Sequence, residues 1–97
     1  MHIISRKALR EFWEEYPDSE EALKAWHHEV DTIEWANSAE VKDKYRSASI
    51  INASRVVFNI CGNKYRLIVA INYKFKIVYV RFVGTHKKYD RVNVEEI

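Results

Sequence analysis

A histidine, two lysines and a tyrosine stand in consecutive positions near the end of this chain, within Gly84-Thr85-His86-Lys87-Lys88-Tyr89-Asp90. An imidazole has an unperturbed pKa of about 6.5, so His86 can take up and release a proton near neutral pH. Lysine attracts phosphate, and tyrosine can stack on a base or form a hydrogen bond. These groups are suited to gripping or cutting RNA. The alternative for His86 is a solvated histidine in a surface loop.

Arg66 is the second candidate, one predicted strand earlier in the chain. Its guanidinium could hold a phosphate in two prongs. The alternative is a strand arginine paired with a carboxylate, and residues 45–97 offer few partners for it: Asp90, Glu95 and Glu96. Arg81 is predicted on the same sheet face as Arg66, which favours the phosphate interpretation.

Three predicted strands position these residues. Side chains alternate with a period of two over residues 55–60, 64–71 and 78–83, with turns at Gly62-Asn63 and near residues 74–76. The pattern predicts a three-stranded antiparallel meander. Its apolar face carries Phe58, Leu67, Val69, Val80 and Phe82. The opposite face is expected to carry Arg55, Asn59, Lys64, Arg66, Tyr79 and Arg81.

Helices are predicted for the first half of the chain. Ser5 can cap a helix that runs to about Tyr16, and Asp18 with Glu21 resembles a capping box for a second helix. Asn37 with Glu40 can cap a short third helix, and residues 46–54 read as a loop. Residues 2–4 form a plausible edge strand. The expected fold is α+β, one domain over residues 1–97, with N-terminal helices packed on one face of a small, mainly antiparallel sheet.

The composition sets limits on function. The chain has 97 residues, of which 47% are hydrophobic and 31% charged, and it has no apolar run long enough to span a membrane. The single cysteine, Cys61, fits a reducing cytoplasm, and no Cys/His cluster has zinc spacing. Residues 1–44 hold six Lys/Arg and eleven Asp/Glu, whereas residues 45–97 hold ten and three. A basic second half, formally +7, attracts a polyanion if one surface presents it.

Several segments resemble the HigB toxins of bacterial type II toxin–antitoxin systems, within the RelE/ParE superfamily. The similar segments are Val57-Phe58-Asn59-Ile60, Gly62-Asn63-Lys64-Tyr65-Arg66-Leu67, and Gly84-Thr85-His86 followed by Tyr89-Asp90. Leu23-Lys24-Ala25-Trp26 and the later Trp35 match the helical part. The resemblance covers essentially the whole chain. It implies an mRNA interferase that cleaves messenger RNA in the ribosomal A site and is neutralised by a helix-turn-helix antitoxin similar to HigA.

The resemblance also implies roles for individual residues. Arg66, His86 and Tyr89 are the expected catalytic residues of a metal-independent endoribonuclease in which the RNA 2′-hydroxyl is the nucleophile. The expected RNA-binding residues are Arg55, Asn63, Lys64, Arg81, Lys87 and Lys88. Many relatives carry an acidic residue between the His and the Tyr, where this chain has Lys87-Lys88, so the general base stays unassigned. The alternatives are a non-catalytic RNA-binding module or a superfamily member that binds a protein such as gyrase.

Overall fold

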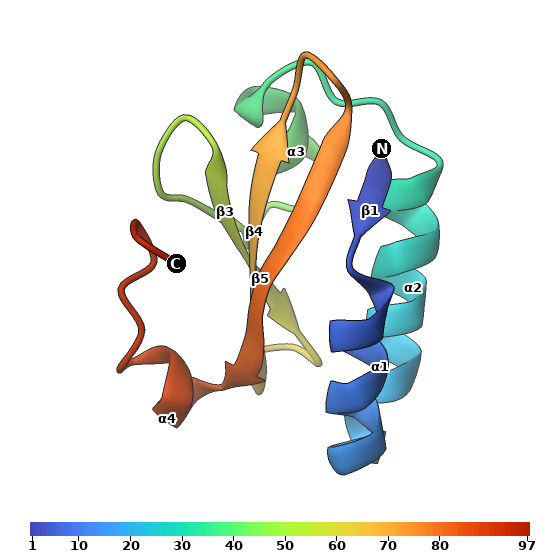
Figure 1. Ribbon diagram of the computed structural model, residues 1–97, viewed down its shortest axis with the longest axis vertical. Coiled ribbons are helices and arrows are strands. Elements are labelled where there is room, and N and C mark those ends of the chain that lie inside the picture. Colours follow the sequence, from blue (N-terminus) through green and yellow to red (C-terminus); the bar gives the residue numbers. More distant parts are fainter.

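The computed structural model describes residues 1–97 as a layer of helices packed against one face of a five-stranded sheet (Figure 1). The strand order is β1-β5-β4-β3-β2, with β1 parallel to β5 and the other neighbours antiparallel. The strands are β1 (His2–Ile4), β2 (Ser49–Ile50), β3 (Arg55–Ile60), β4 (Tyr65–Asn72) and β5 (Ile77–Thr85). The helices are α1 (Arg6–Glu15), η1 (Pro17–Ser19), α2 (Glu20–Asp31), α3 (Ser38–Lys44) and α4 (His86–Tyr89). The α+β prediction and the N-terminal edge strand are confirmed.

Two of the three predicted helix caps are present. The Ser5 side chain accepts a hydrogen bond from the backbone N–H of Ala8, and Asn37 accepts one from that of Glu40. The predicted capping box at Asp18 is wrong, because α2 begins after Ser19 without a side-chain cap and Asp18 lies in η1. The Asp18 carboxylate has tertiary partners instead, which are described with the site below.

The hydrophobic core lies between the sheet and α1, α2 and α3. Phe58 of β3 is at its centre, with Trp26 of α2 and Tyr45 at ring-centroid distances of 5.4 and 5.1 Å. Leu67 and Val69 of β4 are completely buried on the same face. This confirms the predicted apolar face for β3 and β4. No helix in the structure combines the length and the apolar character needed to cross a membrane.

A β-bulge in β5 overturns the prediction for Phe82. Val69 pairs with Val80 but Ile68 pairs with Phe82, so Arg81 is an extra residue without an opposite partner. The extra residue changes which side chains face the helices. Val80 and Val83 both pack against the core, whereas Phe82 shares the opposite, outer face of the sheet with Ile68.

The outer face is more apolar than the alternation indicated. Val57, Ile68 and Ala70 point away from the main core and are nevertheless buried. The C-terminal segment runs back beside β3, where the Arg55 guanidinium donates hydrogen bonds of 3.2 and 2.8 Å to the Ile97 carbonyl (Figure 1). The segment expected to be a loop between α3 and β3 also contains β2, which extends the sheet beyond β3.

Candidate RNA-binding and catalytic site

The turn between β3 and β4 delivers Arg66 to the outer face. Cys61 and Gly62 take positive φ angles of 54° and 67°, a conformation that favours glycine. The turn predicted at Gly62-Asn63 thus begins one residue earlier, at Cys61, whose carbonyl accepts a hydrogen bond from the Lys64 N–H. Two residues into β4, Arg66 lies opposite Asn59 on one side and Gly84 on the other. It is therefore on the face that the helices do not cover, as predicted.

Asp18 anchors this turn to the helical layer. Its carboxylate forms an ion pair with Lys64 and accepts a hydrogen bond of 2.6 Å from the Tyr65 hydroxyl. The Cys61 thiol donates to the Asp18 carbonyl at 3.1 Å. Hydrogen bonds from Lys64 and Tyr65 lower the pKa of Asp18, and the bond to Asp18 raises the pKa of each partner. The Lys64 side chain thus turns toward the helical layer, so its predicted place on the outer face is wrong.

The short helix α4 supplies the other two expected catalytic residues. It begins directly after β5, where the Thr85 hydroxyl accepts a hydrogen bond of 3.3 Å from the Lys88 N–H. His86 is the first residue of α4 and is half-buried. The Arg66 guanidinium carbon lies 5.7 Å from the centre of the Tyr89 ring, so cation and ring are in contact. Residues separated by some twenty positions in the sequence thus meet at one end of the sheet.

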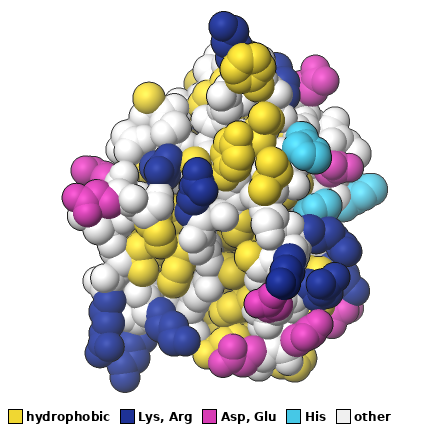
Figure 2. Space-filling view, in the orientation of Figure 1, with side chains coloured by type: hydrophobic (Ala, Val, Ile, Leu, Met, Phe, Trp, Pro, Cys, Tyr) yellow, Lys and Arg dark blue, Asp and Glu magenta, His cyan; other side chains and the backbone are white.

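Exposed basic groups surround this end of the sheet. Lys87 and Lys88 are exposed on α4. In the turn before β4, the Asn63 carbonyl lies 3.5 Å from Nη1 of Arg66. Figure 2 shows Lys and Arg side chains at lower left, over the position of α4, whereas basic and acidic groups intermingle over α1 and α2. Ion pairs such as Lys7 with Glu11 account for part of that mixture. Lys87 and Lys88 thus form a basic surface on α4, the helix whose Tyr89 contacts Arg66.

Two predicted RNA-binding residues lie away from this end. Arg55 opens β3, pairs with Ala70, and is engaged by the C-terminal segment. Arg81 is exposed in the bulge, with its guanidinium carbon 5.1 Å from the centre of the Tyr79 ring. Neither contacts Arg66 or α4 in the structure.

Phe82 is a residue of this face that the sequence analysis missed. It is half-buried, and its ring lies over Gly84, where a built Cβ would come within 2.5 Å of the ring. Gly84 is the residue opposite Arg66 on the neighbouring strand. The available signal was the run Val80-Arg81-Phe82-Val83, in which two adjacent apolar residues leave the alternation ambiguous.

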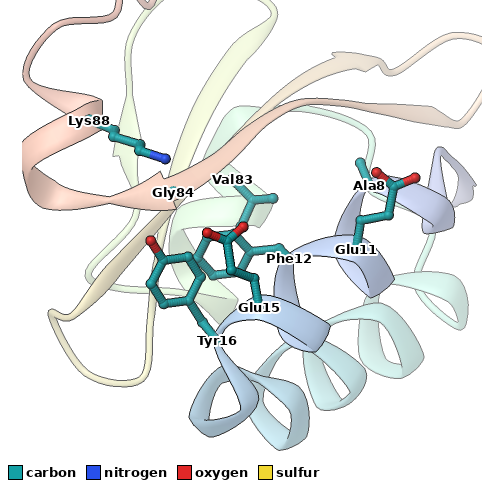
Figure 3. Close-up of a pocket in the computed structure, with 8 residues that line it drawn as sticks. All are labelled: Ala8, Glu11, Phe12, Glu15, Tyr16, Val83, Gly84 and Lys88. Atoms are coloured by element: carbon teal, nitrogen blue, oxygen red, sulfur yellow. The ribbon is translucent and has the colours of Figure 1, made fainter.

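A shallow hollow of about 210 Å³ lies on the other side of β5, against α1. Phe12, Tyr16 and Val83 line its apolar part, and Glu11, Glu15 and Lys88 stand around it (Figure 3). Lys88 thus borders the hollow, whereas Tyr89 of the same helix contacts Arg66. Helix α4 lies between two different surfaces.

The outer-face arrangement can bind and polarise a phosphate. Arg66 offers several N–H donors and a permanent positive charge, His86 offers a proton donor or acceptor, and Tyr89 offers a flat ring. No group of three or more His, Cys, Asp or Glu side chains is arranged to hold a metal ion.

Comparisons with known proteins identify the family of this chain. The model of a family described as HigB_toxin, the RelE-like toxic component of a toxin–antitoxin system, matches residues 19–92. The mRNA interferase toxin HigB of Escherichia coli K12 is 29% identical over 92 residues, covering 93% of this chain and 88% of that protein. An mRNA interferase HigB of E. coli O6:H1 is 24% identical over 94 residues, covering 95% and 91%. The chain therefore belongs to the HigB family of RelE-like toxic components of toxin–antitoxin systems.

Proposed function

We propose that this toxin is an mRNA interferase that cleaves RNA with Arg66, His86 and Tyr89. The observation that carries the proposal is the contact of Tyr89 with the Arg66 guanidinium, and His86 begins the same four-residue helix as Tyr89. The printed function of the relatives, mRNA interferase, supports the same activity. The 97 residues act as one toxin domain in the cytoplasm.

The reaction needs no nucleophile from the protein. The 2′-hydroxyl of the RNA attacks the adjacent phosphorus, its proton leaves to a base, and the P–O5′ bond breaks to give a cyclic phosphate and a 5′-hydroxyl. Arg66 stabilises the charge that develops on the phosphate oxygens. His86 carries one of the two protons, either from the 2′-oxygen or to the 5′-oxygen. Tyr89 orients a base, and no metal ion takes part.

The ribosome supplies the positioning that a small open site lacks. Arg66 is half-buried on the open face of the sheet, and the lysines of α4 are exposed. Holding the RNA in a fixed geometry can replace a large part of the entropic cost of reaction. We therefore place the reaction in the A site, on mRNA that is being translated. A helix-turn-helix antitoxin similar to HigA neutralises the toxin.

The proposal is tested by cleavage of ribosome-bound mRNA in single-turnover reactions. His86→Ala should slow cleavage by about two to four orders of magnitude, because it removes a proton carrier. RNA affinity should change much less, since one neutral imidazole adds little to phosphate attraction. Arg66→Ala should reduce both cleavage and binding, and Lys87→Ala mainly binding.

His28→Ala provides the matched control, because His28 is an exposed histidine on α2. Each variant should melt at about the wild-type temperature. A 2′-deoxynucleotide at the cleaved position should abolish the reaction while leaving binding intact. Wild-type cleavage by His86→Ala would remove His86 from the mechanism. Binding by the wild type without any cleavage would favour the non-catalytic alternative.

A further inference from the structure

The outer face holds a second aromatic side chain next to Arg66. Phe82 reaches this face only because the extra residue Arg81 rotates the end of β5. Without that bulge, the alternation from Val80 would turn Phe82 under the helices. Bulges occur often beside active sites, where they redirect a side chain. The bulge here redirects a large apolar ring toward an otherwise basic surface.

The contacts of Phe82 place its ring within one nucleotide of the phosphate site. The ring lies over Gly84, and Gly84 is the direct cross-strand neighbour of Arg66. Paired residues on neighbouring antiparallel strands are only about 5 Å apart. A base is joined to its phosphate through a single ribose. A phosphate on Arg66 and a base on Phe82 are thus compatible with one nucleotide.

The exposure of Phe82 separates it from the core. Ile68, its cross-strand partner, is completely buried, but Phe82 is only half-buried. Figure 2 shows hydrophobic side chains at the surface between the positions of β5 and the C-terminal segment, beside the basic groups at lower left. An apolar ring next to cations is the combination that binds single-stranded nucleic acid, through base stacking and phosphate attraction.

We propose that Phe82 is the floor of a nucleobase-binding subsite, on which one base of the mRNA stacks when its phosphate lies at Arg66. This inference rests on the interferase function proposed above. Tyr89, whose ring contacts the Arg66 guanidinium, then holds a neighbouring nucleotide. Stacking tolerates any base, so Phe82 contributes affinity and positioning rather than sequence choice.

A double-mutant cycle between protein and RNA tests the subsite. Wild type and Phe82→Leu are compared on ribosome-bound mRNA that carries either a normal base or an abasic nucleotide at each A-site position in turn. On normal mRNA, Phe82→Leu should weaken binding, measured with 2′-deoxy-blocked RNA, by about 5- to 150-fold. At one position the abasic RNA should abolish this difference, because the stacking partner is already missing. Phe82→Tyr, which keeps the ring, should bind like the wild type.

Phe75→Leu is the matched control, because Phe75 is a 66% exposed phenylalanine between β4 and β5, remote from Arg66. A second measurement needs no variant: 2-aminopurine at the stacked position should lose fluorescence on binding to the wild type. If 2-aminopurine is not quenched at any position, or if Phe82→Leu loses the same affinity for every RNA, the subsite does not exist. Loss of antitoxin affinity alone would assign the ring to a protein partner. Failure of the wild type to cleave any mRNA would instead refute the interferase proposal.

Discussion

The chemistry of Arg66 depends on the shape of its side chain as well as on its charge. The guanidinium lies against the Tyr89 ring and near the Asn63 carbonyl, so its plane is held at two sides. A flat cation held in this way can donate two parallel hydrogen bonds to a phosphate, which an ammonium cannot do. The arginine is therefore not equivalent to a lysine at this position.

Arg66→Lys separates these two contributions. Because the charge is kept, the affinity for RNA should change little. Cleavage should nevertheless fall by about 10- to 100-fold, since one charge-assisted hydrogen bond and the contact with Tyr89 are lost. Single-turnover rates at saturating ribosome concentration would measure the effect, with Arg46→Lys, an exposed arginine before β2, as the control. A wild-type rate for Arg66→Lys would mean that charge alone is sufficient.

At the scale of elements, Asp18 connects η1 to the start of β4. The lowered pKa of Asp18 means that its ionised form stabilises the fold. This stability is fully present above the unfolded pKa of about 3.9 and is lost as pH falls through the lower folded value. Asp18→Asn should therefore melt below the wild type at pH 6, and the difference should shrink as the pH falls below about 4.

Melting curves of both proteins across that pH range test the anchor. Asp43→Asn is a suitable control, because Asp43 is an exposed aspartate on α3 that forms no ion pair in the structure. Because the ion pair of Asp18 with Lys64 is solvated, it contributes little to stability, and the expected difference in melting temperature is modest. A gap between wild type and Asp18→Asn that stays constant with pH would show that the carboxylate's ionisation is not what holds the turn.

The same element shows where sequence patterns are sufficient and where they fail. The alternation in residues 65–71 placed Arg66 correctly, because both neighbours on β4, Tyr65 and Leu67, are core residues. The alternation placed Phe82 on the wrong face, because a bulge adds only one residue to a strand and two adjacent apolar residues do not reveal where that extra residue lies. Asp18 matched a capping pattern, yet Lys64 and Tyr65, some 46 positions later, are its partners in the folded chain. Whether Asp18 caps a helix or binds Lys64 and Tyr65 depends on tertiary contacts, and a local sequence pattern does not contain them.

At the scale of the whole molecule, part of the positive charge lies where the ligand is expected. The second half of the chain is formally +7, and Figure 2 shows Lys and Arg side chains at lower left, over the position of α4, whereas basic and acidic groups intermingle over α1 and α2. A polyanion would therefore approach from one direction, and an acidic antitoxin segment would compete for the same surface.

Salt should weaken both associations. If Arg66, Lys87 and Lys88 each contact a phosphate, raising salt from about 50 to 200 mM should reduce RNA affinity by roughly 20-fold. Each lysine-to-alanine change should lower the slope by about 0.7. Titrations of RNA and of the antitoxin at several salt concentrations measure this. Salt-independent binding of both partners would argue against a shared basic surface.

The bulge at Arg81 also bears on how such toxins diversify. It lies four residues before the end of β5, so inserting or deleting one residue there would turn only the strand's last segment and leave the rest of the sheet in register. A single-codon insertion or deletion would exchange Phe82 for a neighbouring side chain on the outer face, and it would also shift Gly84 and the start of α4 relative to Arg66. The length of β5 at this one point therefore sets both the side chain on which a base can stack and the place where His86 leaves the sheet.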